Sequence, residues 1–377
     1  MAYDVIVVGV GGMGSATAYH LARRGLRVLA LERFAIPHDM GSSHGITRII
    51  RLAYFEHPSY VPLLVRAYEL WRELERESGL SLLHITGSID AGPPGSRTFE
   101  GSRTSCELHG LPHEVLTSAE LSRRFPAFRL PAEDLAVVQP EGGFLVPERC
   151  VEVHAALATR HGADVRTNER VLGWEPTGGG VAVTTDRGRY EAGKLVVAAG
   201  SWAETLVPSL GAVLAPERQV LAWFDIEDRD LFAPSRFPVF NLDDGDEHWY
   251  GFPEFGTPGF KIGCYRHFRE VVDPETLDRT RVTPRDVELL HGIVSRCFPA
   301  AGVTPLLTKV CLFTNTPDEH FILDHLPGAP QVIVASPCSG HGFKFSSVIG
   351  EIVADLAQHG ETRHDISLHR LSRFAPA

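Results

Sequence analysis

The chain has 377 residues, of which 44% are hydrophobic and 22% are charged, a balance typical of folded globular proteins that excludes a disordered chain. Its 36 basic and 47 acidic side chains give a formal net charge of −11 without any basic block, which argues against a nucleic-acid partner. No apolar stretch reaches the roughly 18 residues that a membrane-spanning helix needs. At about 150 residues per domain, the length suggests two to three domains.

The chain ends and the cysteines indicate a cytoplasmic protein. The N-terminal residues enter an apolar run at Val5 without the basic segment or cleavage site of a secretory signal, and the C-terminal Phe-Ala-Pro-Ala is not a peroxisomal address. None of the six cysteines forms a Cys-x-x-Cys pair or has zinc-finger spacing. We therefore expect free thiols in a reducing compartment.

In chain order, the first predicted element is a βαβ unit. Residues 4–9 form a short apolar run that ends in glycine, as in a strand buried on both faces of a parallel sheet. A helix of small residues is predicted from Gly14 to about Arg24, and Gly25 ends it. A second strand follows over residues 27–32.

Further helices and strands are predicted through the rest of the chain. Apolar residues at helical spacing predict a long helix from Tyr60 to Glu77, with charged residues on its other face. Gly178 to Gly180 predict a hairpin turn. Further helices are predicted over residues 96–110, 150–161, 284–296 and 346–359, and further strands over residues 163–174, 181–185, 189–192, 194–199, 220–225, 248–252, 260–264 and 332–335.

Four of these strands are alike in type although they lie far apart in the sequence. Residues 4–9, 27–32, 194–199 and 332–335 all read as fully buried parallel strands. We infer one sheet assembled from separated segments, with a second domain inserted between them. The predicted fold class is mixed α/β with a Rossmann-like nucleotide-binding domain.

The residues Gly-Val-Gly-Gly-Met-Gly that follow the first strand have the G-x-G-x-x-G spacing of a dinucleotide-binding turn. Gly9 permits the tight turn, Gly11 lets the backbone approach a pyrophosphate, and Gly14 lets the helix pack closely on the sheet. Glu32 ends the second strand, where its carboxylate can accept hydrogen bonds from ribose hydroxyls. Arg33 could face a 2′-phosphate, but Glu32 would repel that group, and the fingerprint alone does not separate NAD from FAD.

Three later segments carry polar residues in unusual settings: Gly41-Ser-Ser-His-Gly-Ile-Thr-Arg-Ile-Ile-Arg51, Asp318-Glu-His-Phe-Ile-Leu-Asp324 and Ser339-Gly-His-Gly-Phe-Lys-Phe-Ser-Ser347. With these segments and the fingerprint, the chain resembles the monomeric sarcosine oxidase and N-methyltryptophan oxidase family, FAD enzymes of the D-amino-acid oxidase superfamily. The resemblance covers essentially the full length. It implies oxidation of a secondary-amine amino acid, sarcosine or another N-methyl amino acid, to an imine that hydrolyses to an amino acid and an aldehyde, with O₂ reduced to H₂O₂.

The resemblance also implies how the chain divides and how it holds FAD. The flavin is expected to be covalent, through a thioether between Cys311 and its 8α-methyl carbon, whereas the sequence pattern alone would make Cys311 a buried structural thiol. The predicted FAD-binding domain takes residues 1–85, 146–215 and 306–377, and the predicted substrate domain, built on an antiparallel sheet, takes residues 86–145 and 216–305.

The resemblance implies roles for four basic residues. Arg51 and Lys344 match the residues that clamp the substrate carboxylate, and a lysine at a helix N-terminus opposes the macrodipole, which favours an anionic partner for Lys344. Lys261 lies in an apolar strand, a poor place for an unpaired ammonium, and matches a residue that promotes O₂ reduction electrostatically. Arg48 matches a residue beside the flavin. The alternatives are a surface ion pair for Arg51, a solvated position for Lys344 and an edge-strand position for Lys261.

The resemblance also implies roles for other residues beside the substrate and the flavin. Tyr250 matches an aromatic residue beside the substrate, with a core tyrosine as the alternative. Gly340 and Gly342 let the last helix approach the flavin pyrimidine, where its positive end can stabilise negative charge, and His341 lies in this turn with packing as its alternative role. The other expected cofactor contacts are Arg33, Ser43, Thr47, Arg48, Gly200, Trp202 and Lys344.

The chain also departs from the family pattern. Phe313 stands where sarcosine oxidases carry Tyr, and Asn241 stands where a Met is familiar. The position of a family active-site His falls on either Tyr265 or His267, and the sequence leaves this choice open. Candidate substrates therefore include sarcosine, bulkier N-methyl amino acids and cyclic imino acids such as proline or pipecolate.

The sequence leaves some other functions to consider beside amine oxidation. Asp318, Glu319, His320, Asp324 and His325 could suggest a metal site, but they match no zinc motif and a strand would point them to both faces, so we expect no metal. The alternatives are an NAD(P)-linked dehydrogenase, a flavin dehydrogenase that passes electrons to a partner and a non-catalytic flavin-binding module. We expect a monomer whose partners are a small-molecule N-alkyl amino acid and O₂, with no nucleic acid and no membrane.

Overall fold

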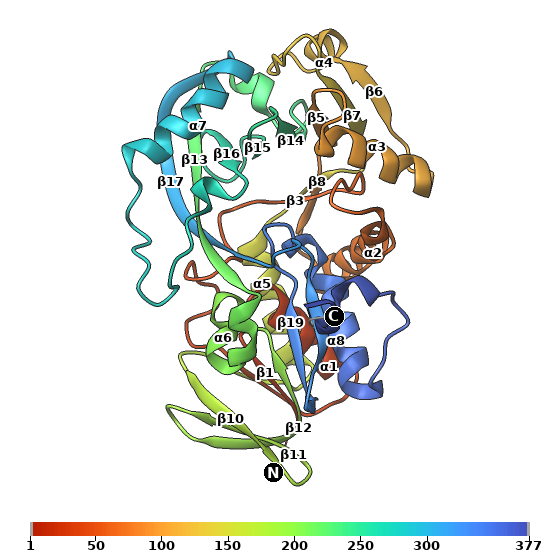
Figure 1. Ribbon diagram of the computed structural model, residues 1–377, viewed down its shortest axis with the longest axis vertical. Coiled ribbons are helices and arrows are strands. Elements are labelled where there is room, and N and C mark those ends of the chain that lie inside the picture. The colour runs from red at the N-terminus through yellow and green to blue at the C-terminus, as the bar shows by residue number, and fades with distance from the viewer. Residues whose placement is uncertain (1–2, 375–377) are drawn as a thin grey trace.

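The computed structural model describes residues 3–374, so residues 1–2 and 375–377 of the predicted FAD-binding domain lie outside the described part. Two sheets of eight strands each dominate the molecule, one in the lower and one in the upper half of Figure 1. This arrangement confirms the predicted mixed α/β fold, in which separated segments build a Rossmann-like sheet and a second, largely antiparallel sheet is inserted.

The lower sheet is built on parallel strands. β1 (Tyr3–Val8) is central and pairs in parallel with β12 (Arg189–Val197) and β2 (Val28–Leu31). β9 (Asp164–Arg166) extends the sheet beside β2, and β19 (Ala329–Ser336) extends it beside β12. The four predicted buried runs are thus β1, β2, β12 and β19. The antiparallel members are β10 (Val171–Thr177), β11 (Gly180–Thr185) and β18 (Ile322–Leu326).

Helices cover this sheet. α1 (Gly12–Arg23) packs between α5 (Pro147–Arg160) and α8 (Ser346–His359), and α2 (Val61–Ser78) packs against α8. The apolar faces of these helices and of β1, β2 and β19 form one continuous core. The short helix α6 (Ala203–Leu206) follows β12.

The first turn shows why its glycines are needed. A Cβ atom added to Gly14 would lie 1.7 Å from the carbonyl oxygen of Gly9, so a larger residue would push the helix off the strand. The helix begins at Gly12 and not at the predicted Gly14, because the extended residue Gly11 already caps it.

Two strand predictions need correction. The predicted strand over 163–174 is two strands, β9 and β10, because Asn168 takes a left-handed φ of 54° between them. The predicted strands over 189–192 and 194–199 are one strand, β12.

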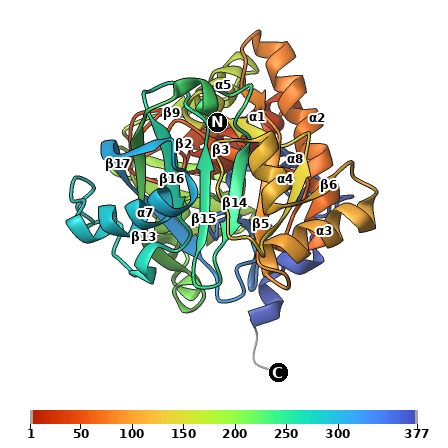
Figure 2. The ribbon, with the colours of Figure 1, turned by 90° about the horizontal axis from the view of Figure 1, so that it is seen from above.

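The upper sheet is shown from above in Figure 2, where β16, β15, β14 and β5 lie side by side. All its neighbouring strands are antiparallel except β5 and β14, which are parallel. Its strand order is β17 (Ala301–Asn315), β13 (Ala215–Ile226), β16 (Phe260–Cys264), β15 (His248–Phe252), β14 (Val239–Asp243), β5 (Ser88–Gly92), β7 (Leu135–Gln139) and β6 (Glu114–Thr117). The helices of this part of the molecule are α3 (Arg97–His109), α4 (Ser118–Arg124) and α7 (Pro284–Cys297).

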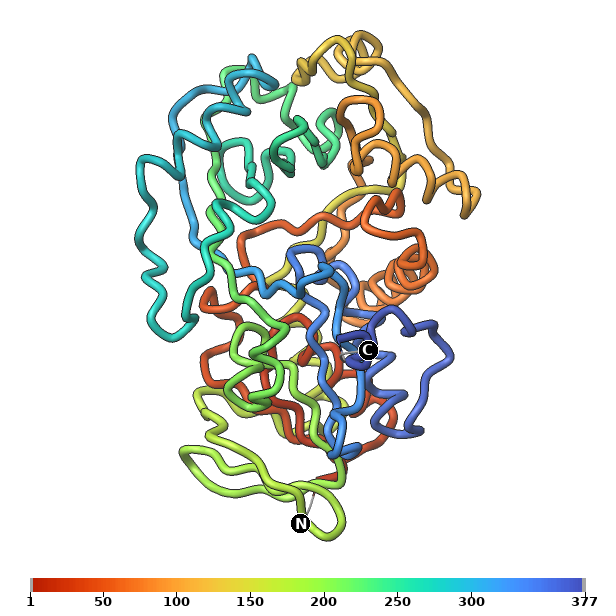
Figure 3. Tube along the Cα trace, in the orientation of Figure 1, coloured from red at the N-terminus to blue at the C-terminus, as the bar shows by residue number. Residues whose placement is uncertain are grey.

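Two long strands run between the lower and upper bodies. β13 and β17 pair from Ala215 opposite Asn315 to Ile226 opposite Ala301, and Figure 3 shows both crossing from one body to the other. The predicted domain boundary at residues 305/306 falls within β17. A small sheet of β3 (Arg48–Ile50), β8 (Gly143–Leu145) and β4 (Leu83–Ile85) also lies between the two bodies. Within residues 3–374, no helix has the length and apolarity to cross a membrane.

Candidate active site

A long cavity starts at the turn between β1 and α1 and runs toward the junction of the two bodies. Most predicted cofactor residues line it: Gly9, Gly11, Glu32, Arg33, Ser43, Arg48, Gly200, Trp202, Gly340 and Gly342. Gly14 lies behind the turn, Thr47 and Cys311 do not line this cavity, and Lys344 lines a second one. The fold therefore gathers residues from five distant segments along one channel.

The carboxylate of Glu32 is fixed at the end of β2. The backbone N–H of Val10 donates to its Oε2 at 2.8 Å, and the N–H of Phe34 donates to its Oε1 at 3.0 Å. These two bonds hold the buried carboxylate at the cavity wall, and each oxygen keeps a lone pair for a further donor.

Arg33 also lines the cavity, but its guanidinium is occupied. It donates to both carboxylate oxygens of Glu275 at 2.6 and 3.0 Å and lies over the rings of Phe34 and Trp202 at 4.8 and 5.1 Å. Glu275 comes from the connection between β16 and α7, so this ion pair ties the inserted domain to the cofactor cavity.

A second cavity opens on the other side of the junction. It is lined by five of the six predicted catalytic residues, Arg48, Arg51, Tyr250, His341 and Lys344. Four residues, Arg48, Phe313, Gly340 and Phe343, line both cavities. A ring system held in the first cavity would meet a molecule in the second one at these residues.

Gly340 keeps this junction open. A Cβ atom at Gly340 would lie 2.5 Å from the ring of Tyr265 and 2.6 Å from that of Phe313, and the backbone has a left-handed φ of 74°. Any larger side chain would close the space between the two cavities.

Lys261 lies behind both cavities and not on their walls. Its Nζ donates to the carbonyl oxygens of Gly45 and Thr47, both at 2.7 Å, and to Oγ1 of Thr47 at 3.0 Å, and it lies 4.2 Å from the centre of the Phe252 ring. Burial and the charge of Arg48 lower the pKa of Lys261 well below its usual value. The edge-strand alternative is wrong, because β16 is paired on both sides.

Arg48 joins the cofactor cavity to the predicted flavin cysteine. Its guanidinium donates to the carbonyl oxygens of Ser42 and Thr47 at 3.0 Å, and Nη2 lies 3.4 Å from Sγ of Cys311. Cys311 itself is buried on β17 against Leu221. A cation therefore lies within contact of an otherwise apolar thiol.

Arg51 is buried, and its guanidinium is already paired. Nη2 donates to both carboxylate oxygens of Glu56 at 2.9 and 2.7 Å, Nε lies 3.7 Å from Asp90, and Nη1 donates to the carbonyl oxygen of Ala53. The Arg51 charge lowers the pKa of Glu56 to about 2 against the effect of burial, whereas burial raises the pKa of Asp90 to about 6. The surface alternative for Arg51 is wrong, because its side chain is 2% exposed.

Lys344 and His341 share one turn before α8. The Nζ of Lys344 donates to the carbonyl oxygen of His341 at 2.8 Å, and burial together with Arg51 lowers the pKa of Lys344 to about 7. The solvated alternative for Lys344 is wrong, because the residue is buried. Tyr54 Oη lies 2.6 Å from Nδ1 of His341, and the carbonyl oxygen of Glu319 lies 2.9 Å from Nε2, so both ring nitrogens have partners.

The structure distinguishes Tyr265 from His267. Tyr265 lines the second cavity, packs against Phe313 at 5.6 Å between ring centres and donates to the carbonyl oxygen of Ser339 at 2.7 Å. His267 is buried away from the cavity and contacts Asp286 at 2.8 Å. Only Tyr265 of the two is placed to contact a molecule in the second cavity.

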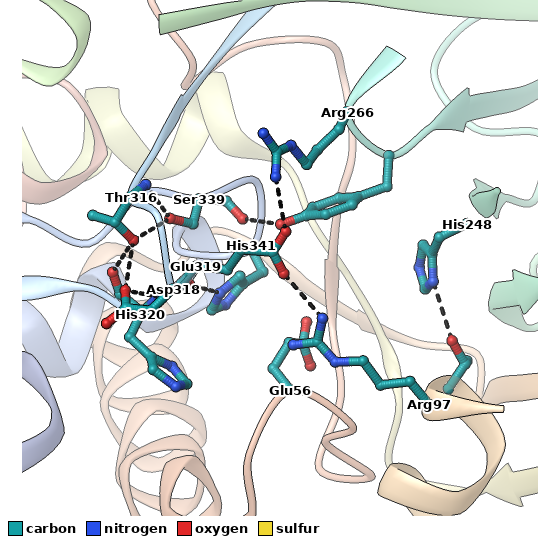
Figure 4. Close-up of polar contacts among 12 residues, drawn as sticks. Glu56, Arg97, His248, Arg266, Thr316, Asp318, Glu319, His320, Ser339 and His341 are labelled. Atoms are coloured by element: carbon teal, nitrogen blue, oxygen red, sulfur yellow. Dashed lines mark hydrogen bonds and ion pairs between the residues drawn. The ribbon is translucent and has the colours of Figure 1, made fainter. Parts of the chain in front are cut away.

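Several residues of the second cavity were not among the predicted site residues. Figure 4 shows Glu319, which accepts from Arg97 at 3.0 Å and from Arg266 at 3.3 Å and so links three segments at the cavity wall. His248 and Glu56 also line the cavity. Glu56 follows Arg51 by five residues, a spacing that could have suggested an ion pair, but the other contacts join residues far apart in the chain.

The acidic and histidine segment around Glu319 has separate partners for its side chains. Asp318 pairs with Arg373 at 2.7 Å, and Asp324 pairs with Arg370 at 2.8 Å. Among residues 3–374, no group of three or more His, Cys, Asp or Glu side chains is placed to hold a metal ion.

Comparison with known proteins defines the class of this chain. Residues 4–356 match the family described as FAD dependent oxidoreductase, and the chain belongs to that family. The first cavity fits FAD: its glycine turn leaves room for a pyrophosphate, and a Cβ atom at Gly12 would lie 2.9 Å from the Phe343 ring.

The similar proteins within this family are amine oxidases, which confirms the resemblance drawn from the motifs. The chain is 44% identical to monomeric sarcosine oxidase from Streptomyces avermitilis, covering 100% of this chain and 98% of that protein. It is 36% identical to N-methyl-L-tryptophan oxidase from Yersinia pestis, covering 99% and 100%. A solved structure of NikD, described as an unusual amino acid oxidase essential for nikkomycin biosynthesis, matches with a TM-score of 0.83 at 29% identity, covering 97% and 96%.

Proposed function

We propose that this FAD-dependent amine oxidase oxidises sarcosine or another N-methyl amino acid to an imine, which water hydrolyses to an amino acid and an aldehyde, while O₂ is reduced to H₂O₂. The observation that carries the proposal is the meeting of a dinucleotide cavity and a cation-lined cavity at Arg48, Phe313, Gly340 and Phe343. Bound FAD would supply the two-electron acceptor for the C–H bond beside the amine. The chain's own residues then have to orient the substrate and stabilise charge.

The substrate carboxylate is held in this proposal by Arg51 and Lys344. Both line the second cavity, and a fixed cationic pair is what an amino-acid carboxylate needs for one orientation. Glu56 lines the same cavity and occupies Arg51, so the incoming carboxylate takes the place of the Glu56 carboxylate. Tyr250, Tyr265 and Phe313 supply the aromatic walls around the N-alkyl group.

Lys261 is proposed to promote the reaction with O₂. Its Nζ donates to three oxygen acceptors in the segment next to Arg48, and these match the three hydrogens of an ammonium and so oppose the lowering of its pKa by burial. A buried positive charge at this place favours the transfer of electrons to O₂, since negative charge develops there. His341 fixes the turn that carries Lys344, and the N-terminal end of α8 adds a further positive potential.

We propose that FAD is covalently attached through Cys311. Nη2 of Arg48, which lines the cofactor cavity, lies 3.4 Å from Sγ, so the sulfur that would form the thioether lies directly behind that cavity wall. Lys261 donates to Thr47, the residue before Arg48, and these bonds keep the segment in place. Flavin that stays with the acid-precipitated protein would support this attachment.

The experiment that tests the function is an anaerobic screen in which N-methyl amino acids and cyclic imino acids are mixed with the purified protein and flavin bleaching is followed. We expect bleaching by sarcosine or a bulkier N-methyl amino acid; bleaching by proline or pipecolate alone would establish a cyclic imino-acid oxidase instead. One H₂O₂ per substrate oxidised is expected in air. A much lower yield would establish a flavin dehydrogenase that passes electrons to a partner.

We also propose that the protein works as a cytoplasmic monomer without nucleic-acid or membrane partners. The relatives named monomeric sarcosine oxidase support the monomer, and the acidic net charge of −11 argues against nucleic acid. Light scattering on the purified holoenzyme tests the first statement, and a mass near twice that of one chain would contradict it.

A further inference from the structure

A hydrogen-bonded network of polar side chains runs from the wall of the substrate cavity to Arg51. Its members are Thr98 in α3, His248 on β15, Asn241 on β14 and Asp90 on β5. Thr98, His248 and Asn241 line the cavity, whereas Asp90 is fully buried behind its wall. The His248 ring packs against Phe55 and Tyr265, with ring centres 4.9 and 5.7 Å away. None of these four residues belongs to the site proposed above.

Each hydrogen bond in this network has one possible assignment of donor and acceptor. Asn241 Nδ2 donates to Asp90 Oδ1 at 2.8 Å, so Oδ1 of the same amide is the acceptor for Nε2 of His248 at 3.3 Å. Nε2 of His248 therefore carries the proton, and Nδ1 accepts from the hydroxyl of Thr98 at 3.1 Å, the contact drawn at His248 in Figure 4. Burial lowers the pKa of His248 to about 4, so the ring keeps this neutral form near neutral pH.

Asp90 connects this network to Arg51. Asp90 and Asn241 are register partners on the parallel strands β5 and β14, which fixes the distance between their side chains. Asp90 Oδ1, the atom that accepts from Asn241, also lies 3.7 Å from Nε of Arg51. The other carboxylate at Arg51 is Glu56, which lines the cavity and can be replaced by a substrate carboxylate, whereas Asp90 cannot be reached from the cavity.

We propose that His248 and Asn241 are positioning residues, which through Asp90 hold the Arg51 guanidinium in the orientation that receives a substrate carboxylate. Without the amide donor, the Asp90 carboxylate is free to turn, and the Nε side of Arg51 loses its fixed partner. The inference rests on the proposed function and deepens it, because it names the residues that make the enzyme select carboxylated amines.

The test uses the purified holoenzyme and acetate as the carboxylate probe, with binding read from the flavin absorbance. Asn241→Leu and His248→Phe remove the donors while keeping a similar side-chain shape, and we expect the Kd for acetate and the KM for the N-methyl amino acid to rise about 10-fold, with kcat within about threefold. His248→Gln restores an N–H donor to Asn241 and is expected to stay close to the parent enzyme.

A double-mutant cycle decides whether the effect acts through Arg51. In the Arg51→Ala background, Asn241→Leu should leave the Kd for acetate unchanged. An equal loss in both backgrounds, or no loss in either single variant, would overturn the inference. Retained flavin and an unchanged Tm show that a variant is folded; if Asn241→Leu does not fold, the His248 pair carries the test. A parent enzyme whose flavin no N-methyl amino acid bleaches would refute the proposed function, while the acetate titration would still report on Arg51.

Discussion

The affinity of the active site for carboxylates should fall as pH rises through the pKa of Lys344. Burial and the neighbouring Arg51 lower this pKa to about 7. A bound carboxylate favours the protonated ammonium, so affinity is highest below about pH 7 and is lost above it. Glu56, with a pKa of about 2, stays ionised through this range, and His341, with a pKa of about 4, stays neutral.

The size of the change follows from what the neutral amine can no longer do. A hydrogen bond from a charged group contributes about 1.5–3 kcal/mol, so losing the Lys344 charge should weaken acetate binding about 10- to 150-fold. The Kd should rise by up to about tenfold per pH unit above the pKa and then level off, because Arg51 keeps its charge.

The assay is a flavin absorbance titration with acetate from about pH 6.5 to pH 9.5, where acetate itself does not titrate and no substrate amine is present. Lys344→Met should give weak binding that does not vary with pH, and Lys344→Arg should give binding that stays strong at high pH. A flat profile for the parent enzyme, or the same pH step in Lys344→Met, would refute the assignment of the step to Lys344.

Three other changes test separate parts of the site. Lys261→Met should slow flavin reoxidation by O₂ about 100-fold or more and change anaerobic reduction by less than about threefold; stopped-flow measurement of both half-reactions checks this, and equal effects would contradict it. Cys311→Ser should leave protein from which acid releases the flavin, and colour that remains on the precipitate would disprove the attachment. Glu56→Gln should lower the KM for carboxylated substrates several-fold, because nothing then competes for Arg51; the Tm should fall, since a buried cation loses its partner.

Local sequence features predicted the frame of this molecule well. The glycine turn at Gly9 and the apolar runs around it depend only on neighbouring residues, so the Rossmann-like sheet followed from the sequence. Contacts that join residues across the fold were not predicted. Asp90 and Asn241 are 151 positions apart and meet only because β5 and β14 are in register, and His248 carries no motif that would single it out.

Long-range contacts also determine the partners of residues that the sequence did single out. Arg33 was expected to contact the cofactor; it lines the cofactor cavity, and its guanidinium pairs with Glu275, 242 positions away. Lys261 was expected to promote O₂ reduction; its Nζ lies behind the walls of both cavities, bound to backbone carbonyls. In each case the residue type indicated that a partner exists, but only the packing decides which atom the partner is.

The charges of the site divide its work between two regions. Arg48 and Lys261 donate to neutral carbonyl and hydroxyl oxygens, and in the proposed mechanism their positive charge acts on the reduced flavin and O₂. Arg51 is held by the carboxylates of Glu56 and Asp90, so its charge becomes available only when a substrate carboxylate displaces Glu56. In the proposed mechanism, the arginine that contacts neutral oxygens, Arg48, stabilises negative charge, and the arginine that contacts carboxylates, Arg51, selects carboxylated substrates.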